Sequence, residues 1–509
     1  MRKETIKMLA LATIATISTP VLTTSCSDDD TVTTERNWST DGGLNAADNL
    51  LFNDSVIGNG DNEFVFNGTQ TLKKGTYLLK GWVYIADGAT LTIEPGTIIK
   101  GDKQTMASLI VERGGKLIAK GTASEPIVFT SEQAKGSRKP GDWGGIIICG
   151  KASHNAGEAQ IEGGPRTKHG GSVDTDNSGV LSYVRIEFAG YPFATDQEIN
   201  GLTLGSVGSG TQIDHVQVSY SNDDSFEWFG GTVNAKYLVA YNGWDDDFDT
   251  DNGYSGTVQY GLVVRNSKIA DKSQSNGFES DNDASGSTAT PVTSATFSNI
   301  TFIGPKAVDA NFVNSSSYIT GGDYYPNNGS GLGRFQAAMQ IRRGSCLNCV
   351  NSVAMGYPIG LMLDGEKGNT QAQAKAGKIT LQNIWFADVE AVGSDANKYY
   401  GDYLVTGYDS IKNPIIDSTQ TSFSSTFFRA QAGNQVTTIS ALNLTGSSRY
   451  PGLTTNFMPQ SSSPMIGAAS FTAVSGRGFD EDVNYIGAFS ANDTWMDGWT
   501  NFDPNNTDY

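Results

Sequence analysis

Short stretches of alternating apolar and polar residues follow one another along most of the chain from Gly81 onward. Segments 82–85, 91–93 and 109–111 are apolar, and glycine-containing turns separate them. Alternation over three to five positions is the period of a β-strand, and no segment here keeps a helical period long enough for a crossover helix. The pattern predicts an all-β fold of many short strands and excludes an ordinary α/β fold.

The strands also recur at a nearly fixed interval. Phe226 and Phe248 lie 22 residues apart in two similar blocks that continue into glycine turns, and Phe278 begins a third copy after an insertion. Each such repeat buries its apolar face against its neighbours. We therefore predict a right-handed, single-stranded parallel β-helix (a solenoid) with N- and C-terminal caps. A β-sandwich array or a propeller, the rival folds, would need longer hairpin-like repeats.

The first thirty residues predict export. Residues 1–25 have the pattern of a secretory signal peptide, in which three basic residues precede an apolar segment, 8–21, that is too short to span a bilayer. The small residues before Cys26 resemble a bacterial lipobox, which implies that Cys26 becomes the acylated (typically palmitoylated) first residue of the mature protein. Residues 27–30, Ser-Asp-Asp-Asp, resemble the acidic tag that directs Bacteroidota lipoproteins to the outer face of the outer membrane. We expect a lipid-anchored outer-membrane protein that faces the exterior.

The rest of the chain divides by composition. We expect a flexible lipidated tether at 26–50, an N-terminal cap at 51–80, the parallel β-helix at 81–440 and a C-terminal cap at 441–509. Long insertions interrupt the predicted strands around 153–178, 265–293, 311–335 and 389–435.

Several motifs resemble one family, the parallel β-helix lipoproteins of Bacteroidota and related bacteria that are often associated with TonB-dependent receptors. The motifs are segments 141–148, 179–190, 200–204, 223–231 and 485–489, with Trp495 and Trp499 near the end of the chain. The resemblance extends over nearly all of the chain after about residue 75. It implies the fold and an outer-membrane location, and it carries over no catalytic residue, because the family has no settled activity.

Charge and cysteine content narrow the function classes. The formal net charge of −19 argues against a nucleic-acid partner and is compatible with divalent cations. Four cysteines are too few for a disulfide scaffold in 509 residues. Cys149 lies in an apolar run and is expected to be buried, whereas Cys346 and Cys349 could form a local disulfide in an oxidising compartment.

Clustered carboxylates are the candidate chemistry. The acidic blocks 223–227 and 245–251 are expected to lie one coil apart. Their carboxylates should therefore stack on neighbouring strands about 4.8 Å apart, where they repel one another or require a cation. Many carboxylate oxygens suit Ca²⁺ better than Mg²⁺. Segments 174–179 and 281–286 also match the opening of a calcium loop but lack its closing glutamate. The candidate calcium ligands are Asp223, Asp224, Glu227, Asp245, Asp246, Asp247, Asp249, Asp251, Glu279, Asp281 and Asp283.

Two tryptophans flank the acidic blocks. Trp228 and Trp244 are either sugar-binding platforms or core residues, and we treat both as candidate ligand-binding residues. The three histidines are scattered along the sequence, and His215 is expected to be solvated.

The favoured function is binding. We expect a surface-exposed lipoprotein that binds a glycan or an outer-membrane uptake partner, such as a TonB-dependent receptor, with calcium ordering its loops. The alternative is a calcium-dependent polysaccharide lyase or glycoside hydrolase, and a third reading is a purely structural surface protein. Arg185, Lys236 and Arg265 are the basic residues near the acidic stretch, but none lies in a recognisable lyase motif, and no pair of carboxylates stands out for hydrolysis.

Overall fold

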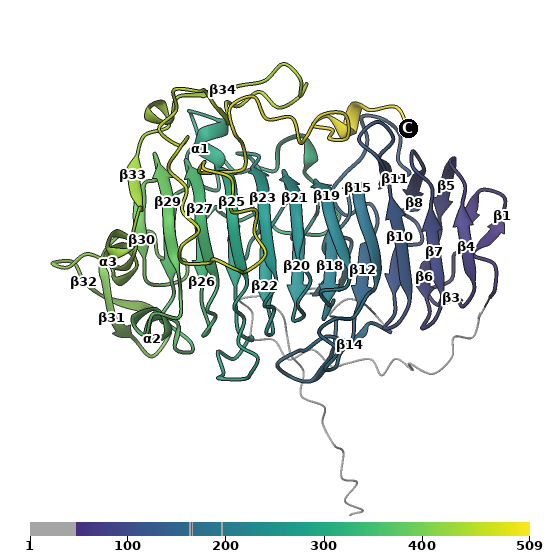
Figure 1. Ribbon diagram of the computed structural model, residues 1–509, viewed down its shortest axis with the longest axis horizontal. Helices are drawn as coiled ribbons and strands as arrows, with labels where there is room; N and C mark the ends of the chain where they lie inside the picture. Colours follow the sequence, from purple (N-terminus) through teal and green to yellow (C-terminus); the bar gives the residue numbers. More distant parts are fainter. Residues whose placement is uncertain (1–46, 162–163, 165, 195–196) are drawn as a thin grey trace, which may run out of the picture.

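The computed structural model describes residues 47–509, except 162–163, 165 and 195–196. Two long sheets lie around one elongated core, and the chain passes from one sheet to the other in successive coils (Figure 1). Strands of neighbouring coils pair in parallel, and Phe226, Phe248 and Phe278 occupy equivalent positions on adjacent strands. The predicted all-β parallel β-helix and its 22-residue repeat are confirmed.

The 11-stranded sheet is made of short strands, one from each coil. They are β3 (Phe64–Phe66), β6 (Trp82–Ile85), β9 (Ser108–Val111), β12 (Gly145–Cys149), β18 (Leu202–Gly205), β20 (Phe226–Phe229), β22 (Phe248–Asp251), β24 (Phe278–Ser280), β26 (Ala337–Ile341), β28 (Ile359–Leu363) and β30 (Ala391–Ser394).

The 16-stranded sheet has two short strands per coil near the N-terminal end and one long strand per coil afterwards. The short ones are β1 (Leu51–Asn53), β2 (Val56–Ile57), β4 (Thr69–Leu72), β5 (Thr76–Leu79), β7 (Thr90–Ile93), β8 (Ile98–Gly101), β10 (Lys116–Lys120) and β11 (Ile127–Ser131). The others are β15 (Gly179–Glu187), β19 (Gln212–Ser219), β21 (Ala235–Tyr241), β23 (Thr257–Val264), β25 (Thr296–Ile303), β27 (Asn348–Met355), β29 (Leu381–Ala387) and the short β33 (Gln435–Thr437). Both β10 and β11 pair with β15, which marks the change.

Each long strand bends at one residue with a positive φ, and the pairing registers skip that position. In the first four long strands the residue is Tyr183, His215, Tyr237 or Tyr260, with φ between 50 and 64°. Their rings stack in order with centroids 4.2, 4.5 and 4.9 Å apart, and we call this stack the aromatic ladder. His215 is therefore half-buried between two tyrosines, so the expectation of a solvated histidine is wrong.

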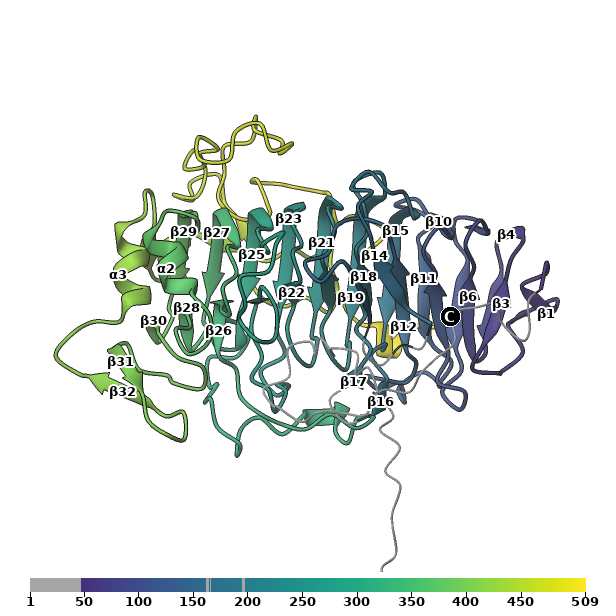
Figure 2. The ribbon, with the colours of Figure 1, turned by 90° about the horizontal axis from the view of Figure 1, so that it is seen from below.

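The remaining elements lie in connections. Hairpins are formed by β13 (Glu158–Gln160) with β14 (Lys168–Gly170), β16 (Pro192–Ala194) with β17 (Gln197–Glu198), β31 (Leu404–Tyr408) with β32 (Pro414–Asp417), and β34 (Leu444–Thr445) with β35 (Met458–Pro459). The helices are α1 (Pro305–Val308), α2 (Thr370–Lys375) and α3 (Phe423–Ala430), with 3₁₀ turns η1 (Gly322–Tyr324), η2 (Ser440–Leu442) and η3 (Pro504–Asn506). Figure 2 shows the β31–β32 hairpin projecting beside the end of the solenoid. None of the helices in the described residues is long and apolar enough to cross a membrane.

The solenoid begins earlier than predicted. Residues 51–80 were expected to form a cap, but β3, β4 and β5 already form a coil whose strands pair in parallel with those of the next coil. The other end is closed by α3, whose Phe427 and Phe428 are buried in the main core. The Phe428 ring stacks on Phe386 at 4.3 Å.

The segment 441–509 is a strap along the solenoid, not a cap at its end. It runs back over the outer face of the 16-stranded sheet, and Figure 1 shows it in yellow crossing the coils toward β11. The backbone nitrogen of Gly487 donates to the Asn351 carbonyl oxygen at 2.8 Å, Gln217 donates to the Asn501 carbonyl oxygen at 2.7 Å, and Lys100 donates to the Tyr509 carbonyl oxygen at 2.7 Å. Apolar strap residues such as Trp499 pack on this face. We call residues 441–509 the C-terminal strap.

The three cysteines among the described residues are free thiols. Cys149 is buried among apolar side chains, as predicted. Cys346 and Cys349 are also buried free thiols, so the local disulfide considered from their spacing is not formed.

Candidate metal centre on the 11-stranded sheet

The outer face of the 11-stranded sheet carries the predicted acidic residues in rows. In β20 and β22 the side chains alternate, so that Phe226 and Phe248 enter the core while Glu227 and Asp249 face outward. Glu279 of β24 continues the outward row on the next coil. The prediction that carboxylates of successive repeats stack is confirmed for this row.

A second row lies in the turns that lead into the strands. Asp224 and Asp246 occupy equivalent places before β20 and β22, and the Asp246 backbone nitrogen donates to Asp224 Oδ1 at 2.9 Å. The Asp246 carboxylate accepts a hydrogen bond from the Asn276 backbone nitrogen on the following coil. Asp251 and Asp281 form a third row at the other end of the strands. We call these rows the acidic ladder: Asp223, Asp224, Glu227, Asp245, Asp246, Asp249, Asp251, Glu279 and Asp281.

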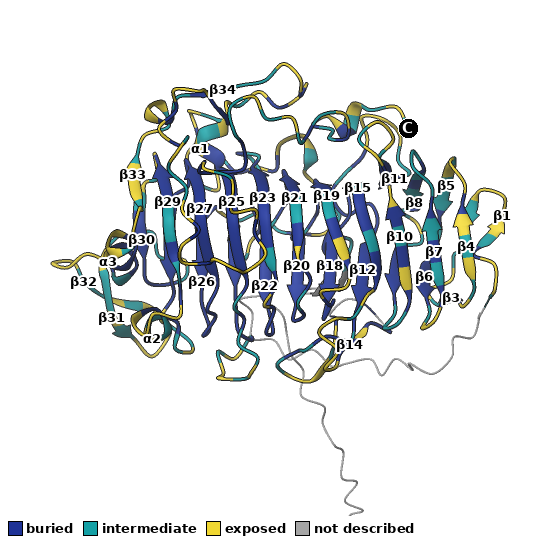
Figure 3. Cartoon of the chain, in the orientation of Figure 1, coloured by how far each residue is buried: buried dark blue, intermediate teal, exposed yellow. Residues whose placement is uncertain are grey.

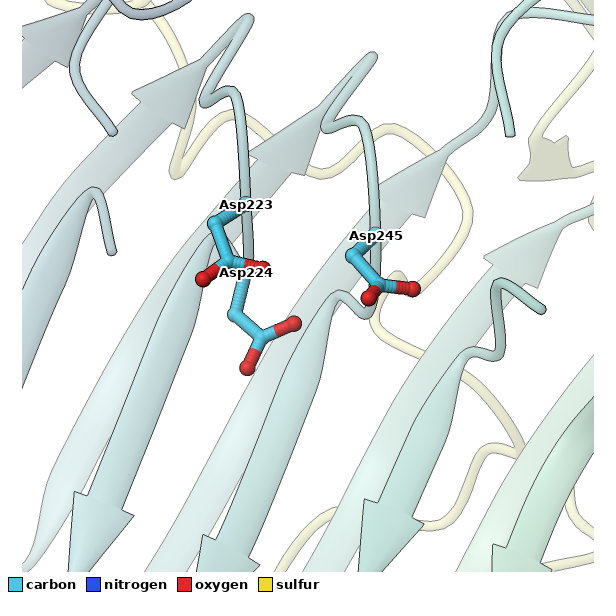
Figure 4. Close-up of side chains that lie close together, drawn as sticks. All are labelled: Asp223, Asp224 and Asp245. Carbon is cyan, nitrogen blue, oxygen red and sulfur yellow. The ribbon is translucent and has the colours of Figure 1, made fainter. Parts of the chain in front are cut away.

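Two groups of three carboxylates converge and share Asp224. One oxygen each of Asp223, Asp224 and Asp245 lies within 4.8 Å of the others, and the same holds for Asp224, Glu227 and Asp249. Figure 4 shows the first triad, in which Asp245 on one coil faces the Asp223–Asp224 pair on the preceding coil. Asp223 and Asp245 are partly exposed, whereas the second triad is buried. Asp224 therefore connects a partly exposed triad with a buried one.

Burial is the main electrostatic influence on the ladder. Strands β20 and β22 are buried along their whole length (Figure 3), although strand alternation turns half of their side chains outward. Burial, reinforced by neighbouring carboxylates, raises the pKa values of Asp224, Asp246, Asp249 and Asp251 well above the ordinary range. These groups favour the neutral form unless a cation stabilises the carboxylates.

Arginines neutralise the far end of the ladder. Arg342 forms ion pairs with Glu279 and, through Nε at 3.0 Å, with Asp281 Oδ1. Arg343 Nη1 lies 2.9 Å from Asp281 Oδ2. Asp249 lies at the boundary, because Arg342 lowers its pKa while Glu279, Asp251 and Asp281 raise it. Glu279 and Asp281 thus have internal cations and do not need a metal ion.

Asp247 belongs to a separate ion pair. Arg265 Nη1 lies 3.0 Å from Asp247 Oδ1 and also donates to the Asp245 carbonyl oxygen at 2.6 Å, and both side chains are completely buried. Burial raises the pKa of Asp247 to about 7, although Arg265 opposes the rise. This pair cross-links neighbouring coils and contributes no ligand to the two triads.

The residues of the two triads fit a calcium ion. They supply only oxygen donors, and Asp249, with 1% of its surface exposed, accepts no hydrogen bond at Oδ1 in the described structure. A buried carboxylate oxygen without a donor is costly, and a hard cation that takes six to eight oxygens would compensate it. Asp223, Asp224, Glu227, Asp245 and Asp249 are the residues that would hold the cation.

The two short loops with calcium-like spacing serve as turns. Asp174 Oδ1 accepts from the Ser153 backbone nitrogen at 2.9 Å. Asp283 accepts from the backbone and side chains of Ser285 and Ser287, which lowers its pKa. The neighbouring Asp281 is directed to the arginines instead. The carboxylates of each loop do not converge, and the expectation of a separate calcium site in either loop is not supported by this geometry.

Neither candidate tryptophan offers a face to a sugar. Trp228 is 0% exposed inside the solenoid and stacks on Tyr254 at 5.3 Å, because it has the same strand parity as Phe226. Trp244 is also 0% exposed, and its Nε1 donates to the Gly331 carbonyl oxygen at 2.9 Å under the 304–336 insertion. The expectation of an aromatic platform beside the carboxylates is therefore corrected.

The basic residues near the acidic stretch have structural partners or lie elsewhere. Arg265 is buried against Asp247, and Arg185 lies 3.3 Å from Glu187 beside the strap. Lys236 lies on β21 of the other sheet. Sequence reasoning missed Arg342 and Arg343, whose place immediately after a strand one coil beyond Glu279 was hidden by the long insertion between them.

Two histidines that are distant in sequence meet beside the ladder. The rings of His154 and His169 lie 5.1 Å apart, and His169 Nδ1 lies 2.9 Å from Ser206 Oγ. Burial lowers the pKa of His154 to about 4 and that of His169 well below its ordinary value, so both are neutral at pH 7. They anchor the 150–178 insertion to the outer face of the sheet.

A family model described as a pectate-lyase-like β-helix domain matches residues 65–441. The chain belongs to this family. The matched segment begins within β3, the first strand of the 11-stranded sheet, and includes the whole acidic ladder of this pectate-lyase-like β-helix protein. The family fits a polysaccharide-related role. A search of curated proteins found no match to the chain.

Proposed function

We propose that the protein binds a polysaccharide at the outer face of the 11-stranded sheet, with calcium held by the triads that share Asp224. The observation that carries this proposal is the convergence of five carboxylates in which Asp249 is buried without a hydrogen-bond donor at Oδ1. Asp223 and Asp245 reach the surface, so hydroxyl or carboxylate oxygens of a sugar can complete the coordination shell of the cation.

Calcium titration tests the proposal. We expect millimolar calcium to raise the thermal midpoint of the purified full-length protein and EDTA to reverse the rise. Asp224→Asn should abolish the shift, since Asp224 belongs to both triads. Asp87→Asn is the matched control, because Asp87 is an exposed aspartate far from the ladder along the sequence. A wild-type midpoint that does not respond to calcium would contradict the proposal. Polysaccharide binding, measured with calcium and with EDTA, is the second step.

The expected location completes the proposed role. The predicted lipid on Cys26 and the acidic residues 28–30, which lie outside the described residues, would anchor the protein on the exterior of the outer membrane. There it would bind glycan, alone or beside a TonB-dependent receptor. Metabolic labelling with palmitate, compared with Cys26→Ala, tests the anchor, and proteolysis of intact cells tests the exposure.

A calcium-dependent lyase or hydrolase is the second candidate. Carboxyl groups with strongly raised pKa values, such as Asp224 and Asp249, are typical of catalytic acids. Against this reading, the arginines beside the ladder are held in buried ion pairs. Incubation with polyuronates and neutral polysaccharides, with assays for unsaturated products and for new reducing ends, distinguishes an enzyme from a binding protein.

A further inference from the structure

A cavity of about 350 Å³ lies on the 16-stranded sheet, whereas the acidic ladder lies on the 11-stranded sheet. Strands β19, β21 and β23 form its floor, and Gly478 and Phe479 of the C-terminal strap form one wall. Its volume lies at the lower end of the range for small-molecule sites. We call it the strap pocket.

The parallel register arranges the polar residues of the strap pocket in two rows across three coils. Gln212, Asn234 and Thr257 form one row, and Asp214, Lys236 and Gln259 form the other. The apolar Ile213 and Ala235, between the two rows, belong to the core. Such rows place hydrogen-bonding groups about 4.8 Å apart along the solenoid axis.

Most polar groups of the pocket already have partners. Asp214 accepts hydrogen bonds at 2.7 Å from each of Ser182, His215 and Gln212. Gln259 exchanges two hydrogen bonds with the backbone of Asp480 in the strap, at 2.8 and 3.0 Å. These contacts hold the walls in place and use the negative charge of Asp214.

Lys236 differs from these partnered groups of the strap pocket. Its side chain is half-buried at the centre of its row, and its ammonium group forms no hydrogen bond or ion pair within the part of the chain that the structure describes. The Tyr237 hydroxyl beside it also has no hydrogen-bond partner among the described residues. A half-buried lysine and a tyrosine thus line the same cavity.

The aromatic residues of the pocket do not provide a stacking platform. Tyr237 is stacked on His215 at 4.5 Å and on Tyr260 at 4.9 Å, so both of its faces are covered. Apart from Phe479 in the strap wall, a ligand therefore meets ring edges, amides and hydroxyls, and recognition depends mainly on hydrogen bonds and charge. Asp480, which accepts a hydrogen bond from the Tyr260 hydroxyl at 3.1 Å, disfavours a ligand with several negative charges.

We propose that the strap pocket binds one acidic sugar unit, a hexuronate, whose carboxylate pairs with Lys236 and whose hydroxyls meet Asn234 and Tyr237. The volume accommodates a ligand of that size, and the single uncommitted cation matches a single carboxylate. This site is independent of calcium and of the acidic ladder, so it stands or falls separately from the proposed function.

Ligand-observed NMR with D-glucuronate tests the inference, with D-glucose as the neutral counterpart. The full-length protein is used in EDTA, so that calcium-mediated binding at the ladder cannot contribute. We expect glucuronate to bind, and glucose to bind at least about tenfold more weakly. Lys236→Met, which keeps the aliphatic stem, should weaken glucuronate binding by about tenfold or more. Higher ionic strength should weaken it as well.

Two further variants separate the charge from the fold. Lys116→Met on β10 removes an exposed lysine of the same sheet outside the pocket and should leave binding unchanged. Lys236→Arg retains a cation and should retain binding. Retained binding in this variant would attribute the loss in Lys236→Met to the missing charge and not to misfolding. The inference is overturned if glucuronate does not bind the wild-type protein, if Lys236→Met binds it equally well, or if glucose binds as tightly as glucuronate.

Discussion

The two ends of the acidic ladder both carry clustered carboxylates on the 11-stranded sheet, but they differ in how these carboxylates are neutralised. At the Glu279–Asp281 end, the chain supplies its own cations in Arg342 and Arg343. At the Asp224 end, the pKa of the carboxyl group is raised by burial and then by Asp223, Asp249, Glu227 and Asp246, all of which are acidic. One end is a finished ion-pair network, and the other has the features of a site that an external cation completes.

The difference shows why an acidic cluster cannot be interpreted from its composition. A carboxylate paired with a buried arginine is a structural element, because both charges lose water and depend on each other. A carboxylate beside like charges is held neutral or requires a metal ion. The comparison predicts that the two ends respond oppositely to mutation and to calcium.

The largest effect is expected for the loss of Arg342. Arg342→Met leaves Glu279 and Asp281 with one fewer partner in a buried environment, and breaking such a network typically costs about 3–5 kcal/mol. Urea denaturation should show this decrease in the free energy of unfolding both with calcium and with EDTA. If calcium restored the stability of the variant, the distinction between the two ends would be lost.

Removal of calcium is expected to have the next largest effect. A ligand that binds only the folded state at a concentration about 100 times its Kd stabilises that state by about 2.7 kcal/mol. EDTA should therefore lower the free energy of unfolding by a similar amount, and Asp224→Asn should make the protein insensitive to EDTA. An EDTA effect that persists in Asp224→Asn would place the metal ion elsewhere.

The pH dependence of the metal-free protein tests the raised pKa values of Asp224, Asp246, Asp249 and Asp251. In the unfolded chain these groups ionise near pH 4, so above that pH the folded state binds more protons than the unfolded state and stability falls as pH rises. Each carboxyl that stays protonated in the fold contributes about 1.4 kcal/mol per pH unit. The low folded-state pKa values of His154 and His169 add only a small opposing slope near pH 7, because an unfolded histidine with a pKa of about 6.5 is mostly neutral there.

Thermal unfolding in EDTA at pH 7.0 and 8.5 measures this slope. We expect the midpoint to be lower at pH 8.5, and the rise caused by calcium to be larger there, since cation binding displaces protons. A midpoint in EDTA that increases with pH over this interval would show that the carboxyl groups are not held neutral in the fold.

Strand parity and the 22-residue period were sufficient to predict the fold and the stacked rows. They place Phe226 and Phe248 in the core and Glu227 and Asp249 outside, as the structure shows. Parity also assigns Trp228 to the core, two residues after Phe226, although its neighbourhood had suggested a sugar platform.

Other features have no periodic signal. The insertion 304–336 separates β25 from β26, so the position of Arg342 one coil beyond Glu279 cannot be counted from the sequence. The path of the C-terminal strap depends on long-range contacts such as that between Lys100 and Tyr509, and no local pattern encodes them. The strap pocket was missed for the same reason, because its wall comes from residues 478 and 479.

The smallest expected change in stability comes from the paired variants Asp249→Asn and Glu279→Gln, which compare the two ends of the acidic ladder most directly. Asp249 and Glu279 are neighbours in one outward row, so Asp249→Asn and Glu279→Gln remove the same charge one coil apart. In EDTA, Asp249→Asn should raise the free energy of unfolding by about 1 kcal/mol, because the amide is neutral without the cost of protonating a buried carboxyl group far above its ordinary pKa. Glu279→Gln should lower it, because Arg342 loses one of its two partners.

Calcium should reverse the order of stability of wild type and Asp249→Asn, but not that of wild type and Glu279→Gln. With calcium, wild type should become more stable than Asp249→Asn, since the variant has lost a ligand of the buried triad. Glu279→Gln should keep its deficit relative to wild type at every calcium concentration. If both variants changed stability in the same direction in EDTA, the row would act as one uniform network, and the division at Asp249 between an internal and an external cation would be wrong.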